Sequence, residues 1–375
     1  MNILFFYGLP IDPIRGGIER VTHTLSLELK QLRHNCFFLA AKDHGSILPD
    51  VGSRQFFLPD SKKISSLQNT VFFESILKEH AIDRVVFQWG DGKRFPYFPV
   101  CERLQIPVVV AIHTDPAFYE RHEYSNRMVK KLKDCLRRRR QRKIYRYNAR
   151  HAKATVLLSE RFRQGFLKHF PDAEQVAVAK KLVAIANPST YDPDYSLLAL
   201  KSKQLLFVGR MEAKVKQPQL LLKIWQGLQE RFPEWSLRLV GGGHEEQMIQ
   251  QMAKDLNLKR VRFEGFCDPQ EFYRQASIFC MMSAYEGFGM VLIEAAANGC
   301  IPVAFDSFVS VSDIICNGKS GYVVPAFDLR AYESALVSLM ESSELRDRFA
   351  RNAIGSTEKF TATKIALAWQ SLLSS

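Results

Sequence analysis

The sequence predicts an α/β protein made of two doubly wound, Rossmann-like halves, each built on a parallel sheet. Both halves alternate short apolar runs with amphipathic helical patterns, which is typical of parallel strands covered by helices. A polar stretch over residues 188–203 separates the halves and is expected to be a linker. The 375 residues exceed what one hydrophobic core usually supports and are comfortable for two domains.

The first half begins with a strand predicted at residues 3–7, a Gly16-Gly17 turn and an amphipathic helix. In that helix, apolar residues recur at helical spacing at Ile18, Val21, Leu25, Leu29 and Leu32. Further strands are predicted over residues 36–41, 84–88, 108–113 and 155–158, and the half closes in a strand and proline turn at 183–188.

The second half repeats the alternation. Strands are predicted over residues 204–209, 235–240, 261–265, 278–282, 301–305 and 321–324, with helices near 217–232, up to 256 and over 269–276. A final helix within 360–375 is expected to cross back, which gives domains 1–188 and 189–359. Because parallel sheets bind ligands at the carboxyl ends of their strands, the two domains are expected to face each other across a ligand-binding cleft.

Composition narrows the class of protein. The chain is 46% hydrophobic and 24% charged, as in ordinary globular proteins, and no apolar run reaches the roughly 18 residues that a membrane span needs. The first eight residues lack the basic start of a signal peptide. The seven cysteines are scattered and form no CxxC pair. We therefore expect a cytoplasmic protein with no metal site and no cofactor.

The most informative segment is Ser283-Ala-Tyr-Glu-Gly-Phe-Gly-Met-Val-Leu-Ile-Glu294. Its two carboxylates, Glu286 and Glu294, flank a glycine-rich turn that leads into an apolar helical run. Backbone amides at the start of a helix have no intrahelical partner and attract anions. Two acceptors for hydroxyl groups beside a phosphate cradle match a sugar nucleotide, which carries sugar hydroxyls, a diphosphate and ribose hydroxyls.

This E-x7-E spacing resembles the motif of retaining glycosyltransferases with the GT-B fold, and most closely glycosyltransferase family 4 (glycosyl transferases group 1). The resemblance is concentrated in residues 204–325. It implies that Glu286 holds donor-sugar hydroxyls and that Glu294 accepts from the ribose. The turn between them, formed by Gly287, Phe288, Gly289 and Met290, is implied to bind the donor through its amides.

A second match is Phe207-Val-Gly209-Arg210-Met with Lys216. Cations in this position can stabilise a departing diphosphate. The family usually separates the arginine and lysine by five residues, whereas here the separation is six and Lys214 is also near, so either lysine could reach the phosphates; Lys216 is preferred.

Weaker matches concern Gly16 and Gly17, implied to contact donor phosphates or the acceptor, and His113, implied to make a polar contact near the donor sugar. The main chain at Phe266 is implied to read the nucleobase.

Residues 127–150 carry twelve basic residues against the single acid Asp134. Met128, Leu132, Cys135 and Leu136 form an apolar stripe on the same predicted helix. This pattern suits an anionic membrane or lipid-linked acceptor, while a solvated face and a nucleic-acid site remain alternatives. No RNA-binding or recognition-helix signature accompanies the run. The basic patch comprises Lys130, Lys131, Lys133, Arg137, Arg138, Arg139, Arg140, Arg142 and Lys143.

The expected function is metal-independent, retaining transfer of a hexosyl group from a nucleotide sugar, favouring UDP, to a glycan or lipid-linked acceptor. Bacterial lipopolysaccharide or capsule synthesis, at the inner face of the cytoplasmic membrane, is the expected setting. Two alternatives stay open: an enzyme of other chemistry with a related fold, such as a nucleotide-sugar epimerase or a phosphorylase, and a non-enzymatic polyanion-binding protein.

Overall fold

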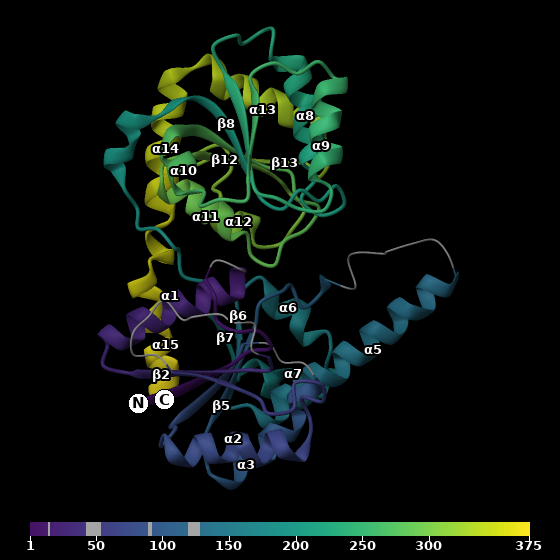
Figure 1. Cartoon of the computed structure of the whole chain (residues 1–375), viewed down its shortest axis with the longest axis vertical. Helices are drawn as coiled ribbons and strands as arrows, with labels where there is room; N and C mark the ends of the chain where they lie inside the picture. The colour runs from purple at the N-terminus through teal and green to yellow at the C-terminus, as the bar shows by residue number, and fades with distance from the viewer. Residues whose placement is uncertain (14–15, 43–53, 89–91, 119–127) are drawn as a thin grey trace. The chain divides into compact units, whose positions relative to one another are not determined.

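The computed structural model describes residues 1–13, 16–42, 54–88, 92–118 and 128–375, except for the side chains of residues 128–133. The chain divides into two compact units (Figure 1). The first unit comprises Met1–Pro188 and Ala362–Ser375, and the second comprises Ser189–Thr361.

The first unit is a parallel sheet with helices on both sides. Its elements are β1 (Asn2–Phe6), α1 (Gly17–Gln31), β2 (Asn35–Ala40), β3 (Arg54–Phe57), α2 (Leu67–Glu79), β4 (Arg84–Phe87), η1 (Gly92–Tyr97), α3 (Phe98–Arg103), β5 (Val108–Ile112), α5 (Met128–His151), β6 (Ala154–Leu157), α6 (Phe162–Leu167), α7 (Asp172–Ala179), β7 (Leu182–Ala184) and α15 (Ala362–Ser374).

The second unit has the same architecture. Its elements are η2 (Tyr195–Leu200), β8 (Ser202–Val208), α8 (Pro218–Leu228), β9 (Ser236–Val240), α9 (Glu246–Asp255), β10 (Val261–Gly265), α10 (Gln270–Gln275), β11 (Ala276–Met281), α11 (Met290–Ala297), β12 (Ile301–Phe305), α12 (Val311–Ile314), β13 (Tyr322–Val324), α13 (Leu329–Glu341), α14 (Ser343–Ser356) and η3 (Glu358–Phe360).

Central strands of both sheets are buried on both faces, which explains their continuous apolar sequence. The strand β5 reads VVVAI, and every residue in it is buried. The strand orders are β3-β2-β1-β4-β5-β6-β7 and β10-β9-β8-β11-β12-β13. Each order reverses once, between β1 and β4 and between β8 and β11, so each sheet has a topological switch point where ligands bind in doubly wound folds.

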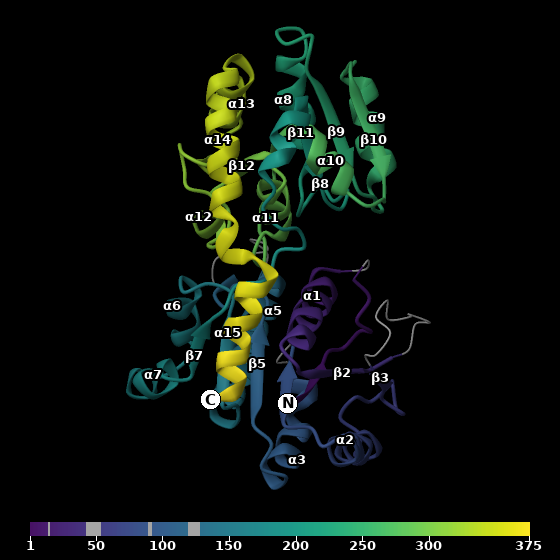
Figure 2. The same cartoon turned by 90° about the vertical axis from the view of Figure 1, so that its left-hand side faces the viewer.

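The last helix, α15, packs beside α1 in the first unit (Figure 2). Trp369 and Ile365 of α15 join the buried core of this unit. Thr363 also donates a hydrogen bond of 2.9 Å to Glu28 of α1. Within the described residues, no helix combines the length and apolar character that crossing a membrane requires.

Two local expectations from the sequence were wrong. The strand β3 was missed, because four half-exposed residues at a sheet edge, Arg54–Phe57, give little periodic signal. The stretch 188–203 is not a free linker, because it packs onto the second unit. Leu197 is 4% exposed, and the Asp194 amide donates 3.1 Å to the carbonyl of Ala297.

Candidate active site

The candidate site lies at the switch point of the second unit. The loop after β8 carries Lys216, and the loop after β11 carries Glu286. These strands are neighbours and run parallel, so both loops leave the same edge of the sheet. A backbone hydrogen bond of 2.7 Å, from the Ala284 amide to the Val215 carbonyl, fastens one loop to the other. The topology thus brings two charged residues together that are seventy positions apart.

Lys216 and Glu286 form a direct ion pair, with Nζ 2.5 Å from Oε1. Ser283 donates from Oγ to the same oxygen at 2.6 Å. The Lys216 and Glu286 side chains are 17% and 13% exposed, so the pair is largely shielded from water. Among the described residues, no hydrogen-bond donor contacts Oε2 of Glu286. That oxygen, and the remaining protons of the Lys216 ammonium, are available to a ligand.

Glu294 occupies a deeper position on α11. It is 1% exposed, and its two oxygens accept hydrogen bonds from Thr190 Oγ1 at 3.1 Å and from Tyr273 OH at 3.2 Å. Burial, followed by the charge of Glu294, raises the pKa of Tyr273 well above its ordinary value, so the phenol remains a donor. Neither Thr190 nor Tyr273 could be predicted from the sequence, because no local spacing links them to Glu294.

Glycine makes the backbone geometry around these carboxylates possible. Gly289 precedes α11 with φ +100, and no side chain caps the helix, so the first amides of α11 have no hydrogen bond to a capping side chain, as in anion-binding helices. Gly241 has φ +124, and a Cβ there would collide with the Gly209 carbonyl. The turns after β8 and β9 therefore approach each other more closely than side chains would permit.

The structure also shows the environments of the other residues predicted to bind the donor. Arg210 pairs with Glu212 at 3.1 Å while its side chain remains 67% exposed. Phe288 is 3% exposed and packs against Phe360, which leaves only its backbone to contact a donor. Lys214 is exposed, whereas Lys216 pairs with Glu286. Phe266, after β10, is 75% exposed.

The first unit places His113 at the carboxyl end of β5. Its Nε2 lies 2.7 Å from Oε1 of Gln88, which follows β4, and the ring is 8% exposed. Burial lowers the pKa of His113 to about 4, and hydrogen bonding to Asn187 opposes the shift. The imidazole is therefore neutral near neutral pH and can contact a ligand as a hydrogen-bonding group rather than as a cation.

This burial predicts a pH dependence of stability. The unfolded chain protonates His113 below roughly pH 6.5, and the folded chain only below about pH 4. Between these values the unfolded state binds more protons, so stability falls as the pH falls from roughly 6.5 to 4, by at most about 3 kcal/mol. Urea unfolding at pH 7 and 4.5 measures this loss. His113→Gln should lose less stability than the wild type over the same interval; an equal loss would contradict the assignment.

The Gly16-Gly17 turn is less open to phosphate than expected. A Cβ on Gly16 would collide with the carboxylate of Glu19, which is 5% exposed at the start of α1. Burial raises the pKa of Glu19, and its own backbone amide stabilises the charged form. The protein's own carboxylate thus occupies the region in which an anion was expected, and a donor phosphate would be repelled there when Glu19 is ionised. Residues 14 and 15 of this motif lie outside the described residues.

Two protein families match the chain. The model for glycosyl transferases group 1 matches residues 192–355, and the model for glycosyltransferase family 4 matches residues 15–183. Together with the two parallel sheets, these matches define the class of the protein as a glycosyltransferase of the GT-B type. The chain belongs to glycosyltransferase family 4 (glycosyl transferases group 1).

Individual relatives agree with this family. An uncharacterised glycosyltransferase of Haemophilus influenzae is 31% identical over 194 residues, which is 51% of this chain and 55% of that protein. The amylovoran biosynthesis glycosyltransferase AmsD of Erwinia amylovora is 29% identical over 204 residues, which is 52% of this chain and 56% of that protein. The chain thus spans about half the length of the curated relatives that it matches.

Solved structures share the fold over the whole chain. The apo lipopolysaccharide outer core galactosyltransferase WaaB matches with a TM-score of 0.70 and 18% identity, covering 100% of this chain and 99% of that one. Anabaena Alr3699/HepE, in complex with UDP and glucose, matches with a TM-score of 0.76 and 17% identity, covering 100% of this chain and 99% of that one. At these identities the likeness establishes the fold alone.

Proposed function

We propose that the protein transfers a hexosyl group from a nucleotide sugar, specifically a UDP-sugar, to a glycan or lipid-linked acceptor with retention at the anomeric carbon. The observation that carries this proposal is the Lys216–Glu286 pair beside the uncapped start of α11, with Glu294 buried on the same helix. A cation, free amides and two carboxylates are what a sugar diphosphate nucleotide requires of a binding site.

Each group has a distinct task in this proposal. The Lys216 ammonium and the first amides of α11 stabilise the negative charge that develops on the diphosphate as it leaves. Oε2 of Glu286 accepts from hydroxyls of the donor sugar, and Glu294 accepts from the ribose. Arg210 supplies a further cation once it exchanges Glu212 for a phosphate. Gly209 also belongs to the proposed donor-binding residues, and the main chain at Phe266 lies next to the base.

Retention follows from a displacement on one face of the sugar, in which a leaving phosphate oxygen takes the acceptor proton as the new glycosidic bond forms. Glu286 is poorly suited to act as a covalent nucleophile, because a carboxylate positioned to accept from the equatorial hydroxyls of the donor sugar lies badly for backside attack on the anomeric carbon. Lys216 provides positive charge for the leaving group, so the proposed reaction proceeds without a metal ion.

The proposed setting is synthesis of a bacterial surface polysaccharide, lipopolysaccharide or capsule, at the inner face of the cytoplasmic membrane. The relatives named for amylovoran biosynthesis and for the lipopolysaccharide outer core support such an acceptor class. A neighbour bound to UDP and glucose supports the choice of donor.

Thermal unfolding with UDP-, GDP-, ADP- and CMP-sugars, in the presence of EDTA, tests the proposal. A donor at 100 times its dissociation constant adds about 2.7 kcal/mol of stability, which shifts a melting curve measurably. We expect a shift with the UDP-sugars and little with the others. No shift with any nucleotide sugar would overturn the proposal, and a shift that vanishes in EDTA would overturn its metal independence.

A further inference from the structure

A second charged surface lies on α5, in the first unit. This helix of 24 residues is the longest in Figure 1 and extends past its neighbours in the first unit. Five basic residues lie on one face of the helix, the last four at three, four, seven and eleven positions after the first, so that they extend over about 16 Å of the helix axis. We name this set the basic stripe; it comprises Arg139, Arg142, Lys143, Arg146 and Arg150.

The basic stripe faces solvent while the opposite face of α5 holds the helix onto the unit. Tyr145, Asn148 and Ala149 are buried on that opposite face. Lys181 further fixes the end of the helix, because its Nζ donates to the carbonyls of Ala149, Arg150 and Ala152 at 2.9, 3.3 and 3.0 Å. The helix that carries the basic stripe is therefore held in place by packing and by hydrogen bonds at its C-terminal end.

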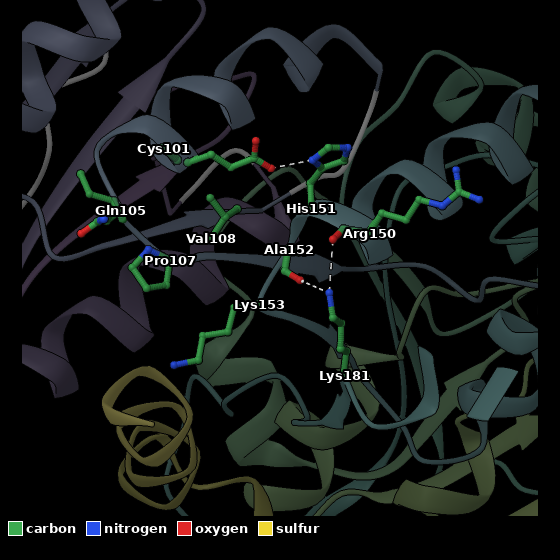
Figure 3. A pocket seen from close by; sticks show the side chains of 11 residues that line it. Cys101, Gln105, Pro107, Val108, Arg150, His151, Ala152, Lys153 and Lys181 are labelled. Carbon is green, nitrogen blue, oxygen red and sulfur yellow. Dashed lines mark hydrogen bonds and ion pairs between the residues drawn. The ribbon is translucent and has the colours of Figure 1, made fainter. Parts of the chain in front are cut away.

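The basic stripe has little negative charge to balance it. Among the described residues, no carboxylate pairs with Arg139, Arg142 or Lys143. Arg146 donates to the His169 carbonyl at 2.8 Å, and Arg150 forms an ion pair with Glu174 at 3.7 Å. Figure 3 shows a pocket at the C-terminal end of α5 that is lined in part by Arg150, His151 and Lys181. Glu102 also lines it, and its Oε1 lies 2.6 Å from Nδ1 of His151. The charges of Arg139, Arg142 and Lys143 are thus available to an external anion.

The stripe differs from the basic patch expected from the sequence. Arg137 pairs with Asp134 at 3.3 Å and points off the stripe, and the side chains of Lys130, Lys131 and Lys133 are outside the described residues. Arg146 and Arg150, by contrast, belong to the basic stripe, although they were not part of the basic patch expected from the sequence.

The basic stripe also borders a hollow of about 450 Å³, which is lined by its five residues together with Tyr147 and His151.

We propose that the basic stripe is a binding surface for the phosphate headgroups of an anionic phospholipid bilayer. Exposed cations along one face of an anchored helix suit a surface that carries many phosphates, and each basic residue near such a surface contributes roughly a fivefold gain in binding, or about 1 kcal/mol. Leu136 lies on the same helical face and is 57% exposed, so an apolar side chain accompanies the charges toward the lipid.

The aromatic residues beside the stripe argue against a single-stranded nucleic acid, which needs free ring faces for its bases. Tyr147 is stacked between Phe95 and His151, with ring centroids 3.9 and 4.2 Å away. Both faces of its ring are therefore covered. The basic stripe therefore offers positive charge, but Tyr147 beside it offers no free ring face on which a base could stack.

Co-sedimentation with vesicles tests the inference on the full chain. The probes are phosphatidylcholine vesicles with and without 30% phosphatidylglycerol. The test variant carries Arg139→Gln, Arg142→Gln, Lys143→Gln and Arg150→Gln; Arg146 is kept because it bonds His169. A matched control removes four exposed charges from the second unit, by Lys223→Gln, Lys254→Gln, Arg330→Gln and Arg351→Gln.

We expect the wild type and the control to bind only the anionic vesicles, and the stripe variant to bind them at least a hundredfold more weakly, with binding that decreases as salt increases. Equal binding by the stripe variant would overturn the inference, as would binding of RNA that depends on the stripe in the absence of vesicle binding. The inference rests on the proposed function only in placing the acceptor at a membrane. Donor-induced thermal shifts, measured on the same variants, report separately on the active site and on folding.

Discussion

Replacing Lys216 by alanine is expected to slow glycosyl transfer by two to three orders of magnitude while the fold persists. Removing one preorganised electrostatic contact to a developing negative charge typically costs about 10²–10³ in turnover. Lys216 is the cation that the structure brings directly to Glu286, and the variant would leave that carboxylate without its charged partner. Steady-state release of the nucleoside diphosphate measures the loss, and a thermal melt of the apo protein confirms folding.

Lys214→Ala is the matched control, because Lys214 lies two residues away in the same loop and is exposed. It should retain activity within a fewfold of the wild type. Arg210→Ala should fall between the two, since Arg210 is 67% exposed and bonded to Glu212. Near-full turnover in Lys216→Ala, or a greater loss in Lys214→Ala, would show that the wrong lysine was assigned to the diphosphate.

Replacing Glu294 by glutamine is expected to weaken donor binding at least tenfold and also to destabilise the second unit. An amide can accept through only one of its two polar atoms, so Thr190 or Tyr273 would lose its acceptor in a site that is 1% exposed. A buried donor left unsatisfied costs about 1–3 kcal/mol. Titration calorimetry with the nucleoside diphosphate measures the first effect, and urea unfolding measures the second.

Tyr273→Phe separates the two roles of Glu294. It removes one hydrogen bond to the carboxylate but keeps its charge and one neighbour, Thr190. We expect a smaller loss of donor affinity than in Glu294→Gln, at a similar cost in stability. If Glu294→Gln loses stability but binds the nucleotide as tightly as the wild type, Glu294 is a structural residue and does not contact the ribose.

The fold class could be predicted because its signals are local. Buried parallel strands such as β5 and β12 are short apolar runs, and the helices between them show a clear helical period. β3 gave no such signal, because it lies at an edge and is only half-buried. The residues 188–203 looked polar enough for a linker, yet Leu197 and Thr190 reach packed positions that only the tertiary structure defines.

The sequence pattern singles out the two carboxylates of the candidate site, but it does not indicate the residues that contact them. Glu286 and Glu294 stand in one short motif, whereas Tyr273 and Thr190 reach Glu294 from separate segments. The choice between Lys214 and Lys216 depends on how a loop turns, and spacing alone left it open. The carboxylate of Glu19 at the Gly16 turn is likewise visible only in three dimensions.

The central claim is that the Lys216–Glu286 site breaks the bond between a sugar and a nucleoside diphosphate. Phosphorus NMR of a UDP-hexose, incubated with the protein and EDTA, measures this directly. We predict slow release of UDP by the wild type without acceptor, faster release with a suitable glycan acceptor, and release at least a hundredfold slower with Lys216→Ala. Equal release by the wild type and Lys216→Ala, or no release from any nucleotide sugar under either condition, would contradict the account.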